Sequence, residues 1–184
     1  MTCILGMEHL GKVHIVCDSC ASNLYNYSII SFPKLFKKND LLIGYTGTFR
    51  YGQIIQYKTS FPDKQKIQTD FEYLSTTGVD TIRNALKNNG SVQTKDNIEE
   101  SLGDCVIGYN GSIYVFQSDF SIIQYKNSIA SVGCGSISAK SALMGLQLNR
   151  ELEKTDPKTL LEEALSIVTS FDCHVKEPFY YDCI

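Results

Sequence analysis

The sequence has no tryptophan and only four prolines and three methionines among its 184 residues. No apolar run approaches the roughly 18 residues that a membrane-spanning helix needs, and no basic segment followed by an apolar one opens the chain, so we expect neither a membrane anchor nor a secretion signal. The net charge of -3 gives no basic surface for nucleic acid. We therefore expect a cytoplasmic protein with no membrane partner and no nucleic-acid partner.

A disulfide framework is also not expected, because the seven cysteines are odd in number and no secretion signal accompanies them. Cys17 and Cys20 form one C-x-x-C pair, but no second pair follows at the spacing of a zinc site. His9, His14 and His174 are scattered and show no metal spacing. We expect no cofactor and no metal, with Cys17 as a small apolar residue ending a buried strand and a metal or redox pair as the minor alternative.

What the sequence does contain is typical of a folded domain. Hydrophobic residues make up 43% and charged residues 20% of the chain, which excludes a disordered protein. The length suffices for one domain with a substantial core but is short for two. We expect a single domain over residues 1–184, without internal repeats.

Apolar patterns and turn residues predict the elements of the first half. Two strands form a hairpin through Leu10-Gly11, and a second strand pair turns at Asn39-Asp40. Residues 19–31 are expected as a loop or irregular strand, and residues 60–75 as a connector. The predicted elements are strands over 2–8, 11–17, 33–38 and 41–45, and helices over about 48–59 and 78–88.

The second half repeats the alternation. Asn110-Gly111 is the strongest hairpin signal in the chain, between strands over 104–109 and 112–117. Thr155 or Asp156 is expected to cap a helix that has Pro157 in its first turn and ends near Phe171. Residues 91–103 are expected as a polar linker. The other predicted elements are short strands over 122–125 and 129–132, a helix from Ser136 to about Glu153, and a final strand over 179–183.

This order of strands, two helices, strands, two helices and a strand predicts the fold class. It fits an α+β protein with two antiparallel sheets and helix layers outside them, a four-layer stack.

The most informative chemistry lies at the start of the chain. Removal of the initiator methionine makes Thr2 the N-terminus, where one residue carries both a hydroxyl nucleophile and a free α-amine as its base. An α-amine titrates near ~7.7–8.0, close to working pH, so it serves as a base without extreme tuning. Retention of Met1 converts this amine into an amide and removes the base. The alternative for Thr2 is an ordinary strand residue.

Several short segments occur in an order and spacing that is characteristic of one family. A Thr-led hairpin ends in Asp18, and a central hairpin spans 104–117. The other matching segments are Phe32-Pro33-Lys34, Gly44-Tyr45-Thr46-Gly47, Gly133-Cys134-Gly135-Ser136 and Phe171-Asp172-Cys173. Over nearly its whole length the chain resembles the proteasome β-type N-terminal-nucleophile (Ntn) hydrolases, most closely the bacterial proteasome-like peptidase HslV. The resemblance implies the four-layer α-β-β-α Ntn-hydrolase sandwich.

The resemblance assigns roles to four residues. It implies that Thr2 Oγ attacks a peptide carbonyl while the α-amine accepts the hydroxyl proton, through a water. Lys34, with apolar flanks, is expected beside Thr2, where its charge stabilises an oxyanion and lowers the pKa of the amine. Asp18 is expected to pair with Lys34, and the Gly47 N–H to bind the tetrahedral intermediate. Each has a simpler structural alternative: a solvated lysine, a turn-capping aspartate and a turn glycine.

Two further residues are implied to support the threonine. Asp172 matches a family aspartate that fixes the threonine region, although a helix-terminal turn residue is nearly as good an interpretation. Cys134 stands where the family has a serine, and cysteine is a weaker donor and acceptor. This departure puts the proton-relay role of the position in question, and Ser136 is an alternative for part of it.

The resemblance also implies an assembly. We expect a homo-oligomeric, stacked double ring that encloses its sites, receives unfolded polypeptide and is fed by an ATP-dependent unfoldase. The predicted function is a threonine peptidase. The alternatives are a catalytically inactive scaffold or partner-binding subunit of the same fold, and a small-molecule amidohydrolase.

Two other features carry less weight. Gly133-x-Gly135 lies between a predicted strand and a helix, as in a phosphate-binding turn, but the third glycine is absent. Tyr45 is expected near the specificity pocket, but one residue does not define a pocket.

Overall fold

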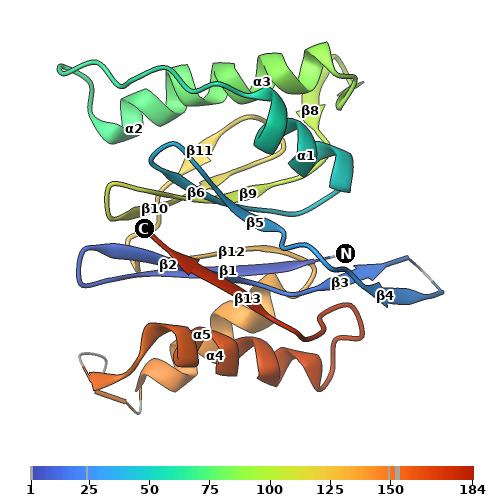
Figure 1. The fold of residues 1–184 in the computed structure, drawn as a ribbon, viewed down its shortest axis with the longest axis vertical. Helices are drawn as coiled ribbons and strands as arrows, with labels where there is room; N and C mark the ends of the chain where they lie inside the picture. Colours follow the sequence, from blue (N-terminus) through green and yellow to red (C-terminus); the bar gives the residue numbers. More distant parts are fainter. Residues whose placement is uncertain (1, 24, 149, 152–153) are drawn as a thin grey trace.

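Two antiparallel sheets face each other in the computed structural model, which describes residues 2–23, 25–148, 150–151 and 154–184 (Figure 1). One sheet has the strand order β12-β1-β2-β13 and the other β11-β10-β9-β6-β5. The strands of the first are β1 Cys3–His9, β2 Lys12–Cys17, β12 Ile129–Gly133 and β13 Tyr180–Cys183. The strands of the second are β5 Leu35–Lys38, β6 Leu41–Tyr45, β9 Cys105–Tyr109, β10 Ser112–Phe116 and β11 Ile122–Ile123.

Helices cover the outer face of each sheet (Figure 1). On the five-stranded sheet lie α1 Phe49–Lys58, α2 Asp70–Tyr73, the π-helical turn η1 Leu74–Gly78 and α3 Val79–Asn88. On the four-stranded sheet lie α4 Ser136–Leu148 and α5 Pro157–Thr169. Among the described residues, no helix combines the length and apolar character needed to cross a membrane.

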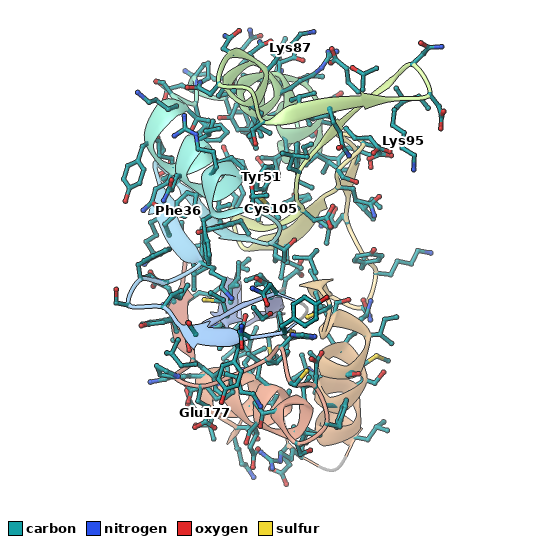
Figure 2. All side chains as sticks on the ribbon, turned by 90° about the vertical axis from the view of Figure 1, so that its right-hand side faces the viewer. Phe36, Tyr51, Lys87, Lys95, Cys105 and Glu177 are labelled. Atoms are coloured by element: carbon teal, nitrogen blue, oxygen red, sulfur yellow. The ribbon has the colours of Figure 1, made fainter. Side chains whose placement is uncertain are left out.

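Each sheet is covered on one face by the other sheet and on the other face by helices. Side chains, which alternate between the two faces along a strand, are therefore buried on both sides. In β1, Ile4 faces the other sheet, while Leu5 and Met7 pack against α4 and α5. A third cluster joins the five-stranded sheet to α1 and α3. Figure 2 shows Tyr51 and Cys105 close together there, with the Tyr51 hydroxyl 3.3 Å from Cys105 Sγ. Burial on both sides fixes the strand register, because a slip of one residue exchanges the two faces.

The predicted hairpin turns are confirmed. Leu10-Gly11 joins β1 to β2, and Asn110-Gly111 joins β9 to β10, all four residues having positive φ, as two-residue turns with this twist require. The predicted cap of α5 is also confirmed, since Asp156 accepts a hydrogen bond from Thr159 N at 3.0 Å.

Residues 91–103 are not a linker, so this prediction is wrong. They contain a two-stranded hairpin of β7 Val92–Lys95 and β8 Ile98–Ser101. Glu99 of this hairpin accepts from Arg83 Nε at 2.9 Å and from Lys87 Nζ at 2.5 Å, which attaches it to α3. Figure 2 shows Lys95 at its outer end. The polar composition of this segment suits a linker, but ion pairs with Arg83 and Lys87 of α3 hold it in place.

Two other boundaries differ from the prediction. The helix expected from about Gly78 to Asn88 is confirmed as α3, but the expected connector over 60–75 ends early, because Thr69 and Glu72 form a capping box for α2, and η1 then continues into α3. The segment 19–31, expected as a loop or irregular strand, contains a separate small hairpin of β3 Cys20–Ser22 and β4 Tyr27–Ile29. The predicted end of a helix near Glu153 lies outside the described residues.

Candidate active site

Thr2 is anchored by its own carbonyl group. The Cys134 N–H donates to Thr2 O at 2.9 Å, and the Cys134 thiol does so at 3.4 Å. The antiparallel register places Cys3 opposite Gly133, which has a φ of +99° and passes so close that a Cβ there would lie 2.0 Å from Thr2 O. Only glycine fits this contact. Thr2 is 4% exposed, so its position at the start of β1 is fixed by β12.

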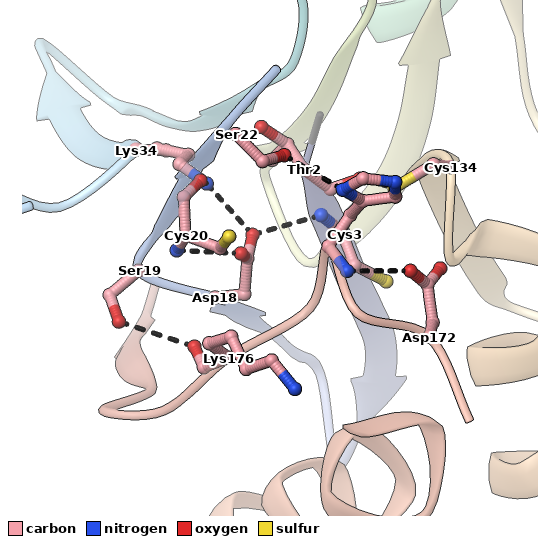
Figure 3. Close-up of polar contacts among 11 residues, drawn as sticks. Thr2, Cys3, Asp18, Ser19, Cys20, Ser22, Lys34, Cys134, Asp172 and Lys176 are labelled. Carbon is pink, nitrogen blue, oxygen red and sulfur yellow. Dashed lines mark hydrogen bonds and ion pairs between the residues drawn. The ribbon is translucent and has the colours of Figure 1, made fainter. Parts of the chain in front are cut away.

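Asp18 connects the end of β2 to the start of β1 (Figure 3). Its Oδ1 accepts from Cys3 N at 2.9 Å and from Lys34 Nζ at 2.9 Å, and its Oδ2 accepts from Cys20 N at 2.8 Å. The Asp18 N–H donates in turn to Cys3 O at 3.2 Å. The carboxylate therefore fixes the residue that follows Thr2 and holds the lysine beside the same strand.

Lys34 is a buried cation. It lies just before β5, is 1% exposed, and donates from Nζ to Asp18 Oδ1 and, at 2.6 Å, to Cys20 O. Burial raises the pKa of the Asp18 carboxyl, and the Lys34 ammonium with the bonded N–H groups opposes this rise. Lys37 differs, because it pairs with Asp182 on the surface. A buried charge with its own counter-ion is costly to fold and marks a functional candidate.

Gly47 lies in an exposed turn between β6 and α1. Its φ is +88°, and a Cβ at this position would lie 2.0 Å from Leu102 O. The neighbouring N–H groups of Thr46 and Thr48 donate to Asp104 O and Leu102 O, but no acceptor for the Gly47 N–H is found in the described part of the chain. An exposed, unpaired N–H is the kind of donor that stabilises an oxyanion.

This turn lies next to the threonine. Thr46 Cγ2 would be 3.1 Å from a Cβ on Gly133, the residue that contacts Thr2 O. Strand β6 therefore delivers Thr46 and Gly47 to the same end of the sandwich as Thr2. The Tyr45 ring packs so closely on Gly52 of α1 that a Cβ there would lie 2.2 Å from it. That Tyr45 lies near a specificity pocket stays a prediction.

Cys134 holds Thr2 through its backbone and thiol. Its side chain is partly exposed, yet desolvation, followed by the nearby Asp172 charge, raises the pKa of the thiol. The group is therefore a neutral thiol at neutral pH, which donates weakly to Thr2 O.

Asp172 lies behind this contact, in the turn after α5. Its Oδ1 accepts from His174 N at 2.8 Å, and its N–H donates to Val168 O at 2.9 Å. Within the described residues its side chain has no hydrogen bond to Thr2. The structure thus brings Thr2, Asp18, Lys34 and Cys134 into one connected set, with Gly47 beside it and Asp172 one step removed.

Sequence reasoning missed the β3–β4 hairpin as part of the site. Cys20 contributes through its backbone alone, which no residue-type pattern reveals, and its side chain is buried together with that of Cys17. The prediction that Cys17 ends a buried strand is confirmed. His174 shows no metal spacing in the sequence, and nothing there indicates that its Nδ1 lies 3.1 Å from Ser22 Oγ.

Comparison with solved structures finds the same architecture in other proteins. Thiobacillus denitrificans BPH matches with a TM-score of 0.82 at 16% identity, over 100% of this chain and 97% of that one, and was also solved in complex with epoxomicin. Eukaryotic HslV from Trypanosoma brucei matches with a TM-score of 0.68 at 16% identity, over 99% and 98% of the two chains. The chain has the proteasome-like Ntn-hydrolase fold. The fold resemblance inferred from the sequence is thereby confirmed.

A third match is the Anbu protein of Pseudomonas aeruginosa, solved as a helical assembly, with a TM-score of 0.66 at 14% identity over 100% of this chain and 81% of that one. No protein-family model matches the sequence, and no curated protein matches it either. At these identities the proteasome-like likeness extends to the fold, and the chemistry depends on the residues described above.

Proposed function

We propose that residues 1–184 form one Ntn-hydrolase domain, a four-layer α-β-β-α sandwich, that acts as an N-terminal threonine peptidase on unfolded polypeptides. The observation that carries the proposal is the buried Lys34–Asp18 pair, joined by hydrogen bonds to the residue after Thr2. A protein gains little stability from such a pair, so a catalytic use explains why the chain has it.

The reaction follows from the groups present. After removal of Met1, the Thr2 α-amine accepts the hydroxyl proton, through a water, as Thr2 Oγ bonds to the peptide carbonyl carbon. The carbonyl oxygen becomes an oxyanion that accepts from the Gly47 N–H, while the Lys34 ammonium stabilises the negative charge. The C–N bond then breaks, the leaving amine takes the proton from the ammonium of Thr2, and an ester remains on Oγ. Water attacks this ester by the same route and restores the hydroxyl.

The setting of this chemistry is part of the proposal. We infer self-assembly into a homo-oligomeric ring, stacked as a double ring, which encloses the sites and receives polypeptide from an ATP-dependent unfoldase in the cytoplasm. The helical assembly of the structurally similar Anbu complex supports association of copies of such a fold.

A catalytically inactive subunit is the second candidate. Cys134 favours it, because a weak thiol donor replaces the serine expected at this position and its hydrogen bond reaches only the Thr2 carbonyl among the described residues. The Gly47 N–H, for which the described residues offer no acceptor, and the buried Lys34 favour the active enzyme, since a scaffold has no use for either.

Two measurements decide between the candidates. Intact mass of the protein from its native host is expected to show loss of Met1, and fluorogenic peptides are expected to be cleaved. Thr2→Ala is expected to abolish hydrolysis while assembly persists, whereas Thr94→Ala, on the exposed strand β7, serves as the matched control with normal turnover. A retained Met1, or unchanged turnover in Thr2→Ala, overturns the peptidase proposal.

A further inference from the structure

The β3–β4 hairpin belongs to neither main sheet. Among the described strands, β3 and β4 pair only with each other, through Cys20–Ile29, Ala21–Ser28 and Ser22–Tyr27. A two-stranded hairpin is marginally stable by itself. Its position beside the site therefore depends on contacts made by other segments.

One end of β3 forms part of the site. The Cys20 N–H donates to Asp18 Oδ2, and the Cys20 carbonyl accepts from Lys34 Nζ at 2.6 Å. The direction of this carbonyl helps to set where the ammonium lies. A rotation or shift of β3 therefore moves the Lys34 charge relative to Thr2.

The other end of β3 is held by the segment that follows Asp172. His174 Nδ1 lies 3.1 Å from Ser22 Oγ, and the His174 N–H is itself fixed by Asp172 Oδ1 at 2.8 Å. Just before β3, Ser19 N and Ser19 Oγ both donate to Lys176 O, at 3.0 and 3.2 Å (Figure 3). Segment 174–176 thus contacts β3 from both ends.

Further contacts keep the same two segments together. Lys176 Nζ lies 5.9 Å from the centre of the Tyr27 ring. A hollow of about 140 Å³ separates the outer part of the hairpin from Cys173 and His174. The His174–Ser22 hydrogen bond therefore spans from one segment to the other at the edge of this hollow.

We propose that His174 is a positioning residue, which holds β3 through Ser22 and thereby fixes the Cys20 carbonyl and the Lys34 ammonium. The inference rests on the proposed peptidase function. His174 is not assigned to catalysis, because no described contact joins its ring to Thr2. The neighbouring Cys134 is a neutral thiol that donates to the Thr2 carbonyl, so no cysteine–histidine nucleophile arises here.

The nature of this hydrogen bond determines which substitution preserves it. A serine hydroxyl donates to a ring nitrogen that carries no hydrogen and accepts from one that does, so the bond persists in either tautomer of His174. An asparagine side chain places a polar atom at a distance similar to that of Nδ1, whereas alanine has none. His174→Asn is therefore the conservative variant, and His174→Ala is the disruptive one.

The kinetic test compares rates per competent site. Sites are counted by titration with epoxomicin, and peptide hydrolysis is divided by that count. His174→Ala and Ser22→Ala are each expected to lower the rate per site about 10-fold, with no further loss in the double variant, because both remove one hydrogen bond. His174→Asn is expected to restore most of the rate. Ser28→Ala, which removes an exposed hydroxyl from the same hairpin, is the matched control.

A second readout separates this inference from the proposed function. Hydrogen exchange of the β3 and β4 amides is expected to quicken in His174→Ala and Ser22→Ala, with β9 and β10 unchanged. If both variants exchange faster than the wild type, but the wild type does not hydrolyse peptides, the inferred contact is supported and the peptidase proposal is rejected. If the wild type is active but amide exchange is unchanged in the variants, only the positioning role is overturned. The same holds if the losses of rate per site are additive in the double variant.

Discussion

Lys34 Nζ lies 2.9 Å from Asp18 Oδ1, and the two side chains are 1% and 0% exposed. The same carboxylate oxygen accepts the N–H of Cys3, so the charge pair and the residue after the candidate nucleophile share one atom. Any displacement of the lysine therefore also disturbs the start of β1. This coupling makes the pair a sensitive place to test both stability and chemistry.

Replacement of the lysine is expected to have two effects. Lys34→Ala is expected to lower peptide hydrolysis on the order of 100-fold or more, since it removes a charge that stabilises the oxyanion. It also leaves the buried Asp18 carboxylate without its partner, which is expected to cost about 3–5 kcal/mol of unfolding free energy. Rates per site and urea unfolding measure the two effects separately.

The surface provides a control for this prediction. Lys37→Ala removes a lysine three residues away that pairs with Asp182, with side chains 48% and 42% exposed. Such pairs contribute little, so stability is expected to change by less than about 1 kcal/mol and the rate to stay normal. If Lys34→Ala behaves like Lys37→Ala, the assigned role of Lys34 is wrong.

The sequence predicted the burial of Lys34 for a partly wrong reason. Apolar flanks indicate burial in the sequence, yet Phe32 is 42% exposed and Pro33 is exposed as well. Lys34 is buried because Asp18 and the Cys20 carbonyl approach it, and these lie 16 and 14 residues away. Local composition cannot show such an approach, whereas the family order of segments did bring Asp18 and Lys34 together.

The secondary-structure elements show the same difference between local signals and long-range contacts. Asn110-Gly111 and the cap at Asp156 were predictable because their signals act within a few residues. Contacts such as His174–Ser22, which are 152 residues apart, depend on packing of the whole chain and leave no local pattern. The site was therefore predictable where a family motif covers it and not where a backbone carbonyl or a late turn completes it.

Cys134→Ser tests the departure from the family residue. A hydroxyl is a stronger donor and acceptor than a thiol, so the contact now made by Sγ to Thr2 O at 3.4 Å is expected to tighten. Hydrolysis per site is expected to increase a few-fold. Cys173→Ser, another exposed cysteine, controls for general loss of thiol chemistry. A fall in rate in Cys134→Ser would show that the thiol itself is required.

His14 is expected to make stability depend on pH. Burial, and then the charge of His9, lower the pKa of His14 below its ordinary 6.5, and its Nδ1 lies 2.6 Å from the Tyr181 hydroxyl. Between the two pKa values the unfolded chain binds more protons than the folded chain. The contribution of His14 is therefore present above pH 6.5 and lost as pH falls through the folded pKa. Unfolding between pH 5 and 8 should show a weaker acid loss in His14→Gln than in the wild type.

Gly47 and Gly11 both have a positive φ, so a comparison of their alanine variants separates backbone strain from catalytic function. Gly47 has a φ of +88° and a Cβ there would lie 2.0 Å from Leu102 O, whereas Gly11 has a φ of +74° with nothing within 4 Å of a Cβ. Gly11→Ala is therefore expected to cost only the left-handed backbone penalty, about 1 kcal/mol, and to keep the rate per site. Gly47→Ala adds a clash with Leu102 O that must rotate the turn and point the Gly47 N–H in another direction.

For Gly47→Ala we expect a rate loss on the order of 100-fold, typical of a removed oxyanion donor, with a larger fall in unfolding free energy than in Gly11→Ala. Hydrolysis per titrated site and urea unfolding of both variants give the comparison. The two effects are distinguishable, since unfolding removes sites from the titration whereas a lost donor slows each remaining site. Equal rates per site in the two variants, despite the clash, would mean that the oxyanion is stabilised by a group other than the Gly47 N–H.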